Sequence, residues 1–520
     1  MAPTSSSLLR QAVQHDLDVL KTAVVVRTHQ LMLQAVHARA TRTGEALLGS
    51  IESADGTSSS PMQQQQQPEQ FAATDSAVAV YRQVVEALVA FATTFSKTDK
   101  FVFHLASMRV MYLGLCAVGV KLDQAVQVAG LAAVKDETWH TQLTADREQE
   151  EAGLSARAAK NALPFARNML PHEPMEALTL LKYEIDFYKA GNSARHVASM
   201  KKVFFSVVRS SNGRVAKIPD WYIPPNAVNY TREKGMDGSV GRAHRGVWVN
   251  TKPPDGKQPG VDGEEPKSLD VVVKRLTIHA DAIEMFRQEV EIWYSMKNAN
   301  ILKLYGASHC SRPALLVLED AKNGPLVDYL ARLRQAGTLD ADVNREMWRC
   351  LVEAARGLQF LHENKMVHSN IKSDNILVTA SGNVKLADFG LGMLALQDQA
   401  VMNNKFQELG WRAPNCLLKK PYRRPSFQDD IYSFGLCVVD VLVPKFSSIV
   451  NKISGALKHV GEEGFEPLLH DVTDLIHNGN ALELVQGMCA KNPEARLTLN
   501  EVISRLEILR DSATKTATRK

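Results

Sequence analysis

The sequence predicts an all-α N-terminal region followed by a two-lobed α+β domain, and three observations predict it. Through the first 210 residues, apolar side chains recur at intervals of three and four, the period of one helix face. Apolar–polar alternation of the strand type is almost absent there. After a Pro-rich segment at 218–225, short β-rich runs precede longer helical segments, an order typical of an α+β domain.

The first segment, residues 1–52, is predicted to be an N-terminal helix. The helical period is clearest between residues 8 and 46, where one face carries Leu9, Val13, Leu17, Leu20 and Val24. The segment also contains Asp16 and Asp18 and has no apolar stretch before a small-residue cleavage site. Secretion is therefore not expected, and mitochondrial import is only a weak alternative.

A flexible linker is predicted at residues 53–74. Its composition shifts to Ser, Gly and Pro with five consecutive Gln, which cannot bury enough apolar surface to offset the entropy of ordering. Helical periodicity returns over residues 75–210, punctuated by Gly and Pro, so a helical bundle with short connections is expected there.

The α+β domain is predicted to span residues 221–511, with a helix at 282–296. A small, polar and basic tail at 512–520 is expected to be disordered. The first strands are expected at Gly246–Asn250, Leu269–Leu276 and Leu315–Leu318.

Composition and charge narrow the classes of function. The 520 residues are 45% hydrophobic and 23% charged, as in ordinary globular proteins, which excludes a disordered or collagen-like chain. Residues 1–220 carry 23 basic and 21 acidic side chains, and the remainder carries 38 and 36. Neither part has the excess of positive charge that nucleic acid or an anionic membrane attracts, so neither is an expected partner.

The six cysteines are far apart, with no Cys-x-x-Cys pair and no His at zinc spacing. A disulfide framework, a zinc site and a haem site are therefore not expected, and a reducing, cytoplasmic compartment is. The most apolar stretch, 101–120, contains His104 and Arg109. It is interpreted as a buried or amphipathic helix in which both are satisfied polar groups, not as a membrane span.

Chemistry is indicated by a series of motifs in one order over residues 235–435. A strand ending in Lys274 is followed fifteen residues later by Glu289 in the predicted helix. Each motif alone recurs by chance, but the ordered set is highly specific. The later members are His-Ser-Asn-Ile-Lys-Ser-Asp-Asn at 368–375, Asp-Phe-Gly at 388–390, Trp-Arg-Ala-Pro at 411–414 and Asp-Ile-Tyr-Ser-Phe-Gly at 430–435.

On these motifs the chain resembles the protein kinase family over about 290 residues, from Trp221 to Leu509. The Trp-x-Ile-Pro-Pro lead-in and the Asp-Ile-Tyr-Ser-Phe-Gly segment are most similar to the tyrosine-kinase-like branch of oomycete and plant type. The resemblance implies the two-lobed protein kinase fold, with a β-rich N-lobe and an α-helical C-lobe, placed here after an all-α helical domain.

The resemblance also implies a site for ATP with Mg²⁺. Lys274 would contact the α and β phosphates and pair with Glu289, and Lys372 would contact the γ phosphate. Asp388 would hold magnesium, and Asn375 would hold a second metal ion.

The adenine side of this site is less regular. The resemblance makes Glu319 to Ala321 the hinge that hydrogen-bonds adenine, after the bulky gatekeeper Leu318, and places Leu377 in the pocket. Val272 stands where the family has Ala, in the pocket roof.

The glycine-rich loop that would cover the phosphates is degraded. Met236, Gly238 and Gly241 occupy its three glycine positions, and Ala243 replaces the usual Val. Such loops need small residues, because backbone amides must approach phosphate closely. Nucleotide binding is therefore expected, with reduced affinity.

The catalytic positions depart furthest from the family. Asn370 stands in place of the catalytic Asp, and its neutral amide cannot accept a proton. General-base assistance contributes roughly a hundred to ten thousand fold, or about 3 to 5 kcal/mol of barrier. Asn370 is therefore expected to be inactive as a base.

The region expected to bind acceptor protein departs as well. Ser369 replaces an Arg, and residues 391–412 contain no Ser, Thr or Tyr to phosphorylate. Asn415 replaces a Glu, which predicts that Arg496 lacks its carboxylate partner. Glu408 replaces a small hydroxyl residue and could form an ion pair with Lys372, although a solvent-exposed Glu408 is the simpler interpretation.

A hydrophobic column joining the lobes is implied by the match of Trp293, Leu304, His368 and Phe389 to the family. Plain core packing would account for the same residues, so burial is expected under either interpretation.

Three functions follow from these expectations. The first is a catalytically impaired kinase homologue, a pseudokinase that binds ATP and acts as a signalling scaffold or switch. The second is an active Ser/Thr kinase of low turnover, favoured by Lys372. In the third, the bundle is an effector controlled by the pseudokinase domain, an architecture similar to mixed-lineage kinase domain-like executioners. An ordinary bundle that binds signalling proteins is the preferred interpretation of the helical domain.

Overall fold

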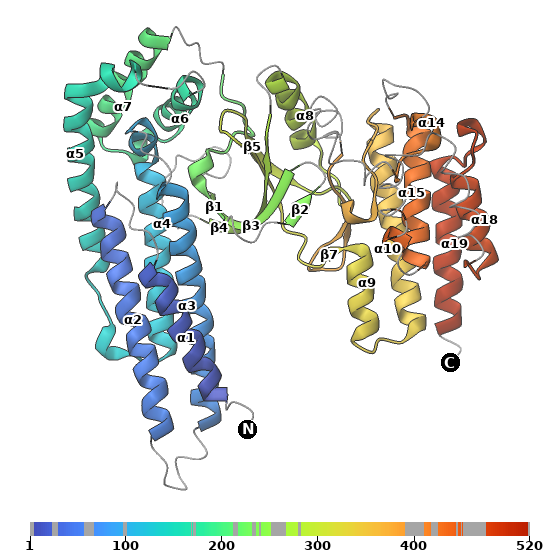
Figure 1. Ribbon diagram of the computed structural model, residues 1–520, viewed down its shortest axis with the longest axis horizontal. Helices are drawn as coiled ribbons and strands as arrows, with labels where there is room; N and C mark the ends of the chain where they lie inside the picture. Colours follow the sequence, from blue (N-terminus) through green and yellow to red (C-terminus); the bar gives the residue numbers. More distant parts are fainter. Residues whose placement is uncertain are drawn as a thin grey trace. The chain divides into compact units, whose positions relative to one another are not determined.

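The computed structural model in Figure 1 describes most of the chain. The described residues are 5–22, 30–56, 67–96, 101–167, 169, 173–211, 217–230, 236–238, 241–250, 267–278, 282–389, 410–417, 425–443, 446–448, 450 and 475–517.

The chain forms two compact units. The first comprises Met1–Gly235 and His244–Val273, and the second comprises Met236–Ala243 and Lys274–Lys520. The first unit therefore contains the helical region together with the first strands of the domain that follows it.

The described part of the chain up to residue 211 is helical, as the periodicity predicts. Short 3-10 turns occur at η1 (Ala132–Val134) and η2 (Lys189–Gly191). The α-helices are α1 (Ser5–Thr22), α2 (Gln30–Gly56), α3 (Gln67–Ser96), α4 (Phe101–Val128), α5 (Trp139–Arg167), α6 (Glu173–Phe187) and α7 (Ala194–Ser211).

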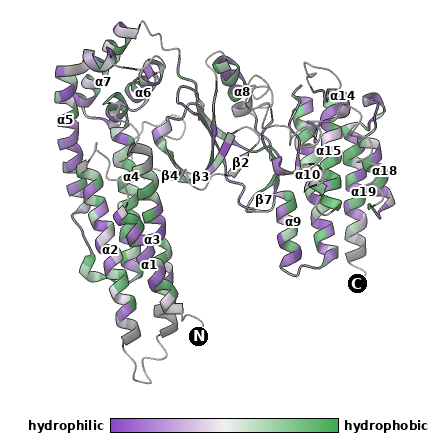
Figure 2. Cartoon of the chain, in the orientation of Figure 1, coloured by the Kyte–Doolittle hydropathy of each residue, from purple (hydrophilic) through white to green (hydrophobic). Residues whose placement is uncertain are grey.

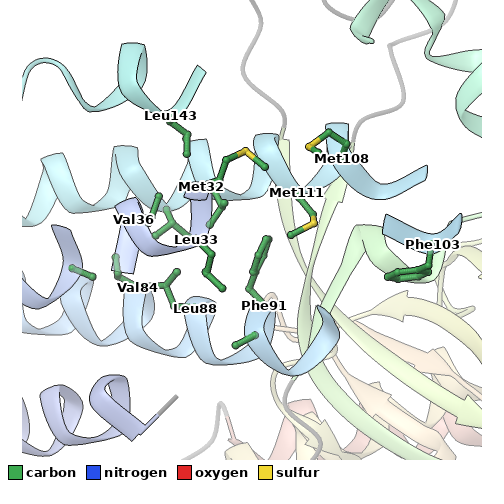
Figure 3. Packing of buried hydrophobic residues seen from close by; sticks show 14 of the residues in the cluster. Met32, Leu33, Val36, Val84, Leu88, Phe91, Phe103, Met108, Met111 and Leu143 are labelled. Atoms are coloured by element: carbon green, nitrogen blue, oxygen red, sulfur yellow. The ribbon is translucent and has the colours of Figure 1, made fainter. Parts of the chain in front are cut away.

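One apolar core holds these helices together. It runs from Val13 of α1 to Val207 of α7, so the predicted N-terminal helical segment is part of the bundle. Helices α1 to α4 lie side by side (Figure 1). Burial of these side chains is the main favourable term that opposes the entropy of ordering the helices. Figure 3 shows how buried side chains of α2, α3, α4 and α5 pack in the core, among them Met32, Leu33, Val36, Val84, Leu88, Phe91, Met111 and Leu143.

Two helix bounds differ from the sequence predictions. The single long helix expected over residues 8–46 is two helices, α1 and α2, which pack against each other. Residues 23–29, between the two helices, lie outside the described residues.

The predicted linker is also narrower than its composition suggests. Helix α2 continues to Gly56 and α3 starts at Gln67, so both ends of the 53–74 segment are helical, and residues 57–66 lie outside the described residues. Gln, Glu and Ala are good helix formers, and Pro68 falls in the first turn, where its missing N–H costs nothing.

Helix α4 is long and apolar enough by composition to cross a membrane, yet 72% of its most apolar window is buried inside the protein. Figure 2 colours much of it as hydrophobic. Arg109 lies within it, is buried, and donates from Nε and Nη2 to Glu184 of α6 at 2.9 and 2.7 Å. The Arg109 guanidinium also lies over the Tyr188 ring, 3.7 Å from its centroid. These contacts confirm the interpretation of α4 as a core helix with a satisfied Arg109.

The Pro-rich lead-in packs with the helical unit. Trp221 and Tyr222 are 1% and 0% exposed, and the Tyr222 ring meets the Tyr183 ring of α6 at 5.2 Å. The 3-10 turn η3 (Pro225–Ala227) packs against α4, and strand β1 (Val228–Tyr230) packs against α3. The predicted domain start at residue 221 is therefore buried against the bundle.

A six-stranded sheet follows, in the order β1-β3-β4-β6-β5 with β2 paired to β3. Gly246 of β3 opposes Tyr230, and a Cβ atom there would collide with the Asn229 carbonyl oxygen. Each of the three predicted strands lies within a strand of the sheet, and α8 (Ile283–Ser295) confirms the predicted helix. The strands after β1 are β2 (Met236–Gly238), β3 (Gly241–Asn250), β4 (Lys267–Leu276), β5 (Leu304–Ser308) and β6 (Ala314–Glu319).

The remainder is a helical lobe with a small antiparallel sheet, β7-β8-β9. Helix α19 (Leu499–Ala517) continues through most of the predicted disordered tail, which corrects that prediction up to residue 517. It packs against α10, where Arg356 pairs with Glu507 at 2.8 Å. The other elements are β7 (Gly324–Pro325), α9 (Leu326–Gln335), α10 (Asp340–Glu363), β8 (Ile376–Val378), β9 (Val384–Leu386), α14 (Pro414–Leu417), α15 (Phe427–Leu442) and α18 (Gly479–Met488). A β-sheet lobe followed by a helical lobe confirms the predicted fold class.

Candidate nucleotide and catalytic site

The loop at residues 368–375 is anchored by the buried carboxylate of Asp430. This carboxylate accepts hydrogen bonds from the backbone N–H of His368 at 2.7 Å and of Ser369 at 2.9 Å. It also accepts one from Nε2 of His362 at 2.9 Å. Hydrogen bonds to a charged carboxylate are stronger than those between neutral groups. The Asp430 carboxylate therefore fixes the backbone of the loop at His368 and Ser369. Asp430 begins the Asp-Ile-Tyr-Ser-Phe-Gly motif, whose sequence alone indicates no partner for this carboxylate.

Asn370 lies at the centre of this loop. Its N–H donates to Nδ1 of His368 at 3.3 Å, and its carbonyl oxygen accepts from Nδ2 of Asn375 at 2.7 Å. The Asn375 N–H donates to the carbonyl of Lys372 at 2.9 Å. These bonds bring Asn370, Lys372 and Asn375 together as the motif predicts.

Two residues of the site have left-handed backbone conformations. Ser369 has φ 62° and Asp388 has φ 61°. These values cost conformational energy for any residue other than glycine. Such conformations persist only where the surroundings hold them, and they gather at functional sites. The Asp430 hydrogen bond to Ser369 N–H is one such restraint.

Lys274 forms a buried ion pair with Asp388, and not with Glu289 as predicted. Burial raises the pKa of Asp388, but the Lys274 ammonium and its hydrogen bond outweigh burial and hold that pKa below its usual range. Burial alone raises the pKa of Glu289, which forms no ion pair among the described residues. An unpaired charge inside a protein is costly. The buried Lys274 therefore forms an ion pair with Asp388, the carboxylate that packing places beside it.

The donor set around Asp388 suits a hard cation. The backbone of Asn375 accepts a hydrogen bond from Ala387 N–H at 2.9 Å, which places Asn375 next to the residue before Asp388. The Asn375 amide donates its Nδ2 to Asn370, so its oxygen is oriented as an acceptor. Carboxylate and amide oxygens are the ligands that Mg²⁺ accepts.

No zinc or haem site was predicted, and that remains a prediction. Among the described residues, no cluster of three or more His, Cys, Asp or Glu side chains is placed to hold a metal ion.

Three members of the predicted hydrophobic column are in contact. The Phe389 ring lies 4.7 Å from the Trp293 ring and 6.1 Å from the His368 ring, measured between centroids. Trp293 also donates from Nε1 to the Leu302 carbonyl at 2.9 Å. Leu304, the fourth member, is buried on β5. Phe389 therefore ties α8 to the catalytic loop by packing.

The predicted hinge continues directly from β6. Leu318 is buried at the end of that strand, and the Glu319 N–H donates to the Lys303 carbonyl at 3.0 Å. The Glu319 carboxylate pairs with Lys385 of β9 at 3.0 Å. Ala321 is buried, and its carbonyl accepts from Gly324 N–H at 2.8 Å.

The other predicted pocket residues lie on regular strands. Leu377 lies on β8, paired with Pro325 and Lys385. Val272 lies within β4, two residues before Lys274. These strand positions do not show whether Leu377 and Val272 contact a ligand, so their role in adenine binding stays a prediction.

The degraded glycine-rich loop is a hairpin. Gly238 pairs with Gly241 at its end, and Met236 pairs with Ala243. The two glycines thus flank the tip of the hairpin. Because glycine has no side chain, the backbone at these positions could approach a phosphate closely.

Arg496 has a carboxylate partner, contrary to the prediction from Asn415. Its Nη1 donates to Oδ1 of the buried Asp429 at 3.1 Å, and its Nη2 donates to Oδ1 of Asn415 at 2.8 Å. The Asn415 amide in turn donates to Asp429 at 2.7 Å. The carboxylate lost at position 415 has therefore been replaced from α15. The Ser-x-x-Asp capping signal at 426–429 marked Asp429 in the sequence but gave no hint of Arg496.

Other predicted features lie outside the described residues. These are Glu408 with its proposed Lys372 pair, Gly390, and the loop up to residue 409.

Comparisons with known proteins agree with this architecture. Residues 233–506, more than half of the chain, match the family described as protein tyrosine and serine/threonine kinase. The chain is 28% identical over 260 residues to cysteine-rich receptor-like protein kinase 27 of Arabidopsis thaliana, covering 47% of this chain and 40% of that protein. It is 25% identical over 238 residues to serine/threonine-protein kinase STY46 of the same plant, covering 45% and 39%.

A third relative is an animal protein. The chain is 26% identical over 223 residues to tyrosine-protein kinase Btk of Drosophila melanogaster, covering 42% of this chain and 25% of that protein. The chain thus spans well under half the length of these relatives. Because the family match covers more than half of its residues and includes the Lys274, Asn370 and Asp388 motifs, the chain belongs to the family of protein tyrosine and serine/threonine kinases.

Proposed function

We propose that this chain is a pseudokinase of the tyrosine-kinase-like branch, which binds ATP weakly and acts as a cytoplasmic signalling scaffold or switch. The observation that supports the proposal is Asn370, which stands where the kinase family has its catalytic Asp, in a loop held by hydrogen bonds from Asn375 and to Asp430. The amide cannot take a proton from an acceptor hydroxyl. Loss of a general base costs roughly a hundred to ten thousand fold in rate.

The Lys274–Asp388 ion pair supports a switch. The two side chains that the family uses for phosphate and for magnesium neutralise each other here. In an ATP complex, Lys274 would contact the phosphates, and Asp388 and Asn375 would hold Mg²⁺, whose charge would offset that of the phosphates. Nucleotide binding would therefore separate Lys274 from Asp388. The domain would then have two arrangements, one with this ion pair formed and one with nucleotide bound.

Lys274→Met should remove nucleotide binding. A ligand at a hundred times its dissociation constant stabilises the protein by about 2.7 kcal/mol, and this increment should vanish because the phosphate-facing cation is gone. Thermal unfolding with and without ATP and Mg²⁺ measures it. Lys303→Met, an exposed lysine of the same lobe, is the matched control and should keep the increment. A wild-type protein with no stabilisation under Mg²⁺, Mn²⁺ or metal-free conditions would remove the nucleotide proposal.

Asn370→Asp should restore little phosphate transfer. The carboxylate returns the base, but Ser369 and Asn415 leave acceptor positioning altered, and residues that act as a unit have non-additive effects. Transfer of labelled phosphate to a general protein substrate, compared with wild type and Asn370→Ala, measures the outcome. Robust turnover from this single change would show that the other departures are harmless.

A low-turnover Ser/Thr kinase is the second candidate, supported by the retained anchor of Asp430 on the loop that carries Lys372. Positioning and metal can sustain some transfer without a base. The same labelled-phosphate assay on the wild-type protein separates the two, because a pseudokinase should show no transfer above the Lys274→Met background.

A further inference from the structure

One helix of the bundle and half of the helix packed against it carry basic side chains and no acidic ones. The second half of α5, residues 152–167, and all of α7, residues 194–211, contain no Asp or Glu. The rest of residues 1–211 carries 14 basic and 20 acidic side chains, so the positive charge is concentrated on these two segments. The basic side chains are Arg157, Lys160 and Arg167 on α5 and Arg195, Lys201, Lys202 and Arg209 on α7.

The two helices run parallel. Ser193, just before α7, donates to Glu151 of α5 at 2.8 Å, and Lys202 donates to the Ala159 carbonyl at 2.9 Å. The contacting residues therefore rise in number in the same direction along both helices. The apolar side of α7 is buried in the bundle core.

The outer side of α7 carries a row of evenly spaced cations. Arg195, Lys202 and Arg209 are exposed and follow one another at intervals of seven residues. Seven residues advance a helix by about 10.5 Å and return to nearly the same face. The row is therefore straight and about 21 Å long. We call these three residues, with Phe205, the basic row.

Phe205 lies in the basic row between Lys202 and Arg209, and 57% of it is exposed. Among the described residues, the four basic side chains of α7 form no ion pair with a carboxylate. The Lys202 ammonium is positioned by the Ala159 carbonyl. Exposed aromatic rings and arginines, such as Phe205 and Arg209, are enriched at protein interfaces.

We propose that the basic row binds an acidic α-helix of a partner protein, with carboxylates spaced seven residues apart and an apolar side chain against Phe205. Heptad spacing matches the row on a partner helix lying along α7, and complementary charge gives partner choice and fast association. A bilayer is less well matched, because the apolar side of α7 is buried and Phe205 alone would enter lipid. The proposal names a partner for the helical domain of the proposed switch, and rests on the proposed function in that respect only.

The test uses the full chain and a fluorescent 22-residue helical peptide with Glu at three positions seven residues apart. A second peptide has the same composition with the Glu positions scrambled. Lys202→Glu with Arg209→Glu should weaken binding of the ordered peptide at least tenfold, about 1.4 kcal/mol. Phe205→Ser should weaken it less. Lys21→Glu, a single charge reversal on α1, is the control for Lys202→Glu alone and should leave binding within about twofold.

Three results would overturn the proposal. Equal affinity for both peptides would show unspecific charge attraction, and absence of binding would show no docking site. Binding of the chain to phosphatidylserine vesicles, lost in the charge-reversal variant while neither peptide binds, would assign the row to a membrane. Circular dichroism melting verifies that each variant is folded. The wild-type ATP titration is independent of this peptide assay, so each proposal can fail without the other.

Discussion

Glu184→Gln should lower the free energy of unfolding of the helical domain by about 3 to 5 kcal/mol. The side chains of Arg109 and Glu184 are 5% and 4% exposed, and two hydrogen bonds join them. The substitution keeps the shape but removes the charge, which leaves the guanidinium of Arg109 buried without a counterion. Asn192 also donates to Glu184 at 3.2 Å and would lose its charged acceptor.

Denaturant unfolding followed by circular dichroism measures this loss. Asp186→Asn, which breaks the exposed pair with Lys182 on the same helix, is the matched control and should cost under about 1 kcal/mol. The double variant Arg109→Met, Glu184→Leu should cost less than Glu184→Gln, because no buried charge remains. Equal stability of Glu184→Gln and wild type would mean that Arg109 reaches solvent and that the pair is not enclosed.

Asp429→Asn should destabilise the helical lobe by about 3 kcal/mol. The Arg496 side chain is 0% exposed and that of Asp429 is 3% exposed, so the variant leaves a buried guanidinium without a carboxylate. Adding Asn415→Glu to the variant should recover part of the loss, since it returns a carboxylate to the same guanidinium. Asp511→Asn, which touches only an exposed pair with Arg510, serves as the control.

The loss should depend on pH. Burial raises the pKa of Asp429, but hydrogen bonds from Asn415 and Ser426 outweigh it and lower that pKa to about 2. A carboxylate with a depressed pKa adds stability above its unfolded value of about 3.9, and this stability is lost as pH falls through the folded value. The difference between wild type and Asp429→Asn should therefore be constant above about pH 5 and shrink toward pH 2. A difference that does not change with pH would show that charge is not its source.

The fold could be predicted because local patterns determine it. Strands such as β6 and the helix α8 follow from apolar runs and periodicity, and the ordered motifs place Lys274, Asn370 and Asp388 in one site. Side-chain partners could not be predicted. Lys274 has two carboxylates, Glu289 and Asp388, at plausible sequence positions, and only packing decides which one it meets.

The charge of the helical domain shows the same limit. Counting side chains over the first 220 residues gives near balance, and that balance hides the one-signed region of α5 and α7. Charges cancel in a count, but they cancel in space only if the helices bring them together. The Asp429–Arg496 pair could not be predicted for a similar reason. Its two residues are 67 positions apart, and only the folded chain brings them together.

The burial of Trp221 and Tyr222 on the bundle also bears on how the chain folds during synthesis. Domains generally fold as they emerge, from the N-terminus onward. The bundle can close once α7 has been made, and the lead-in then finds Tyr183 already in place. Strand β1 would dock against α3 before β3, its sheet partner, has been translated. The helical domain would thus act as a template for the first strand of the kinase sheet.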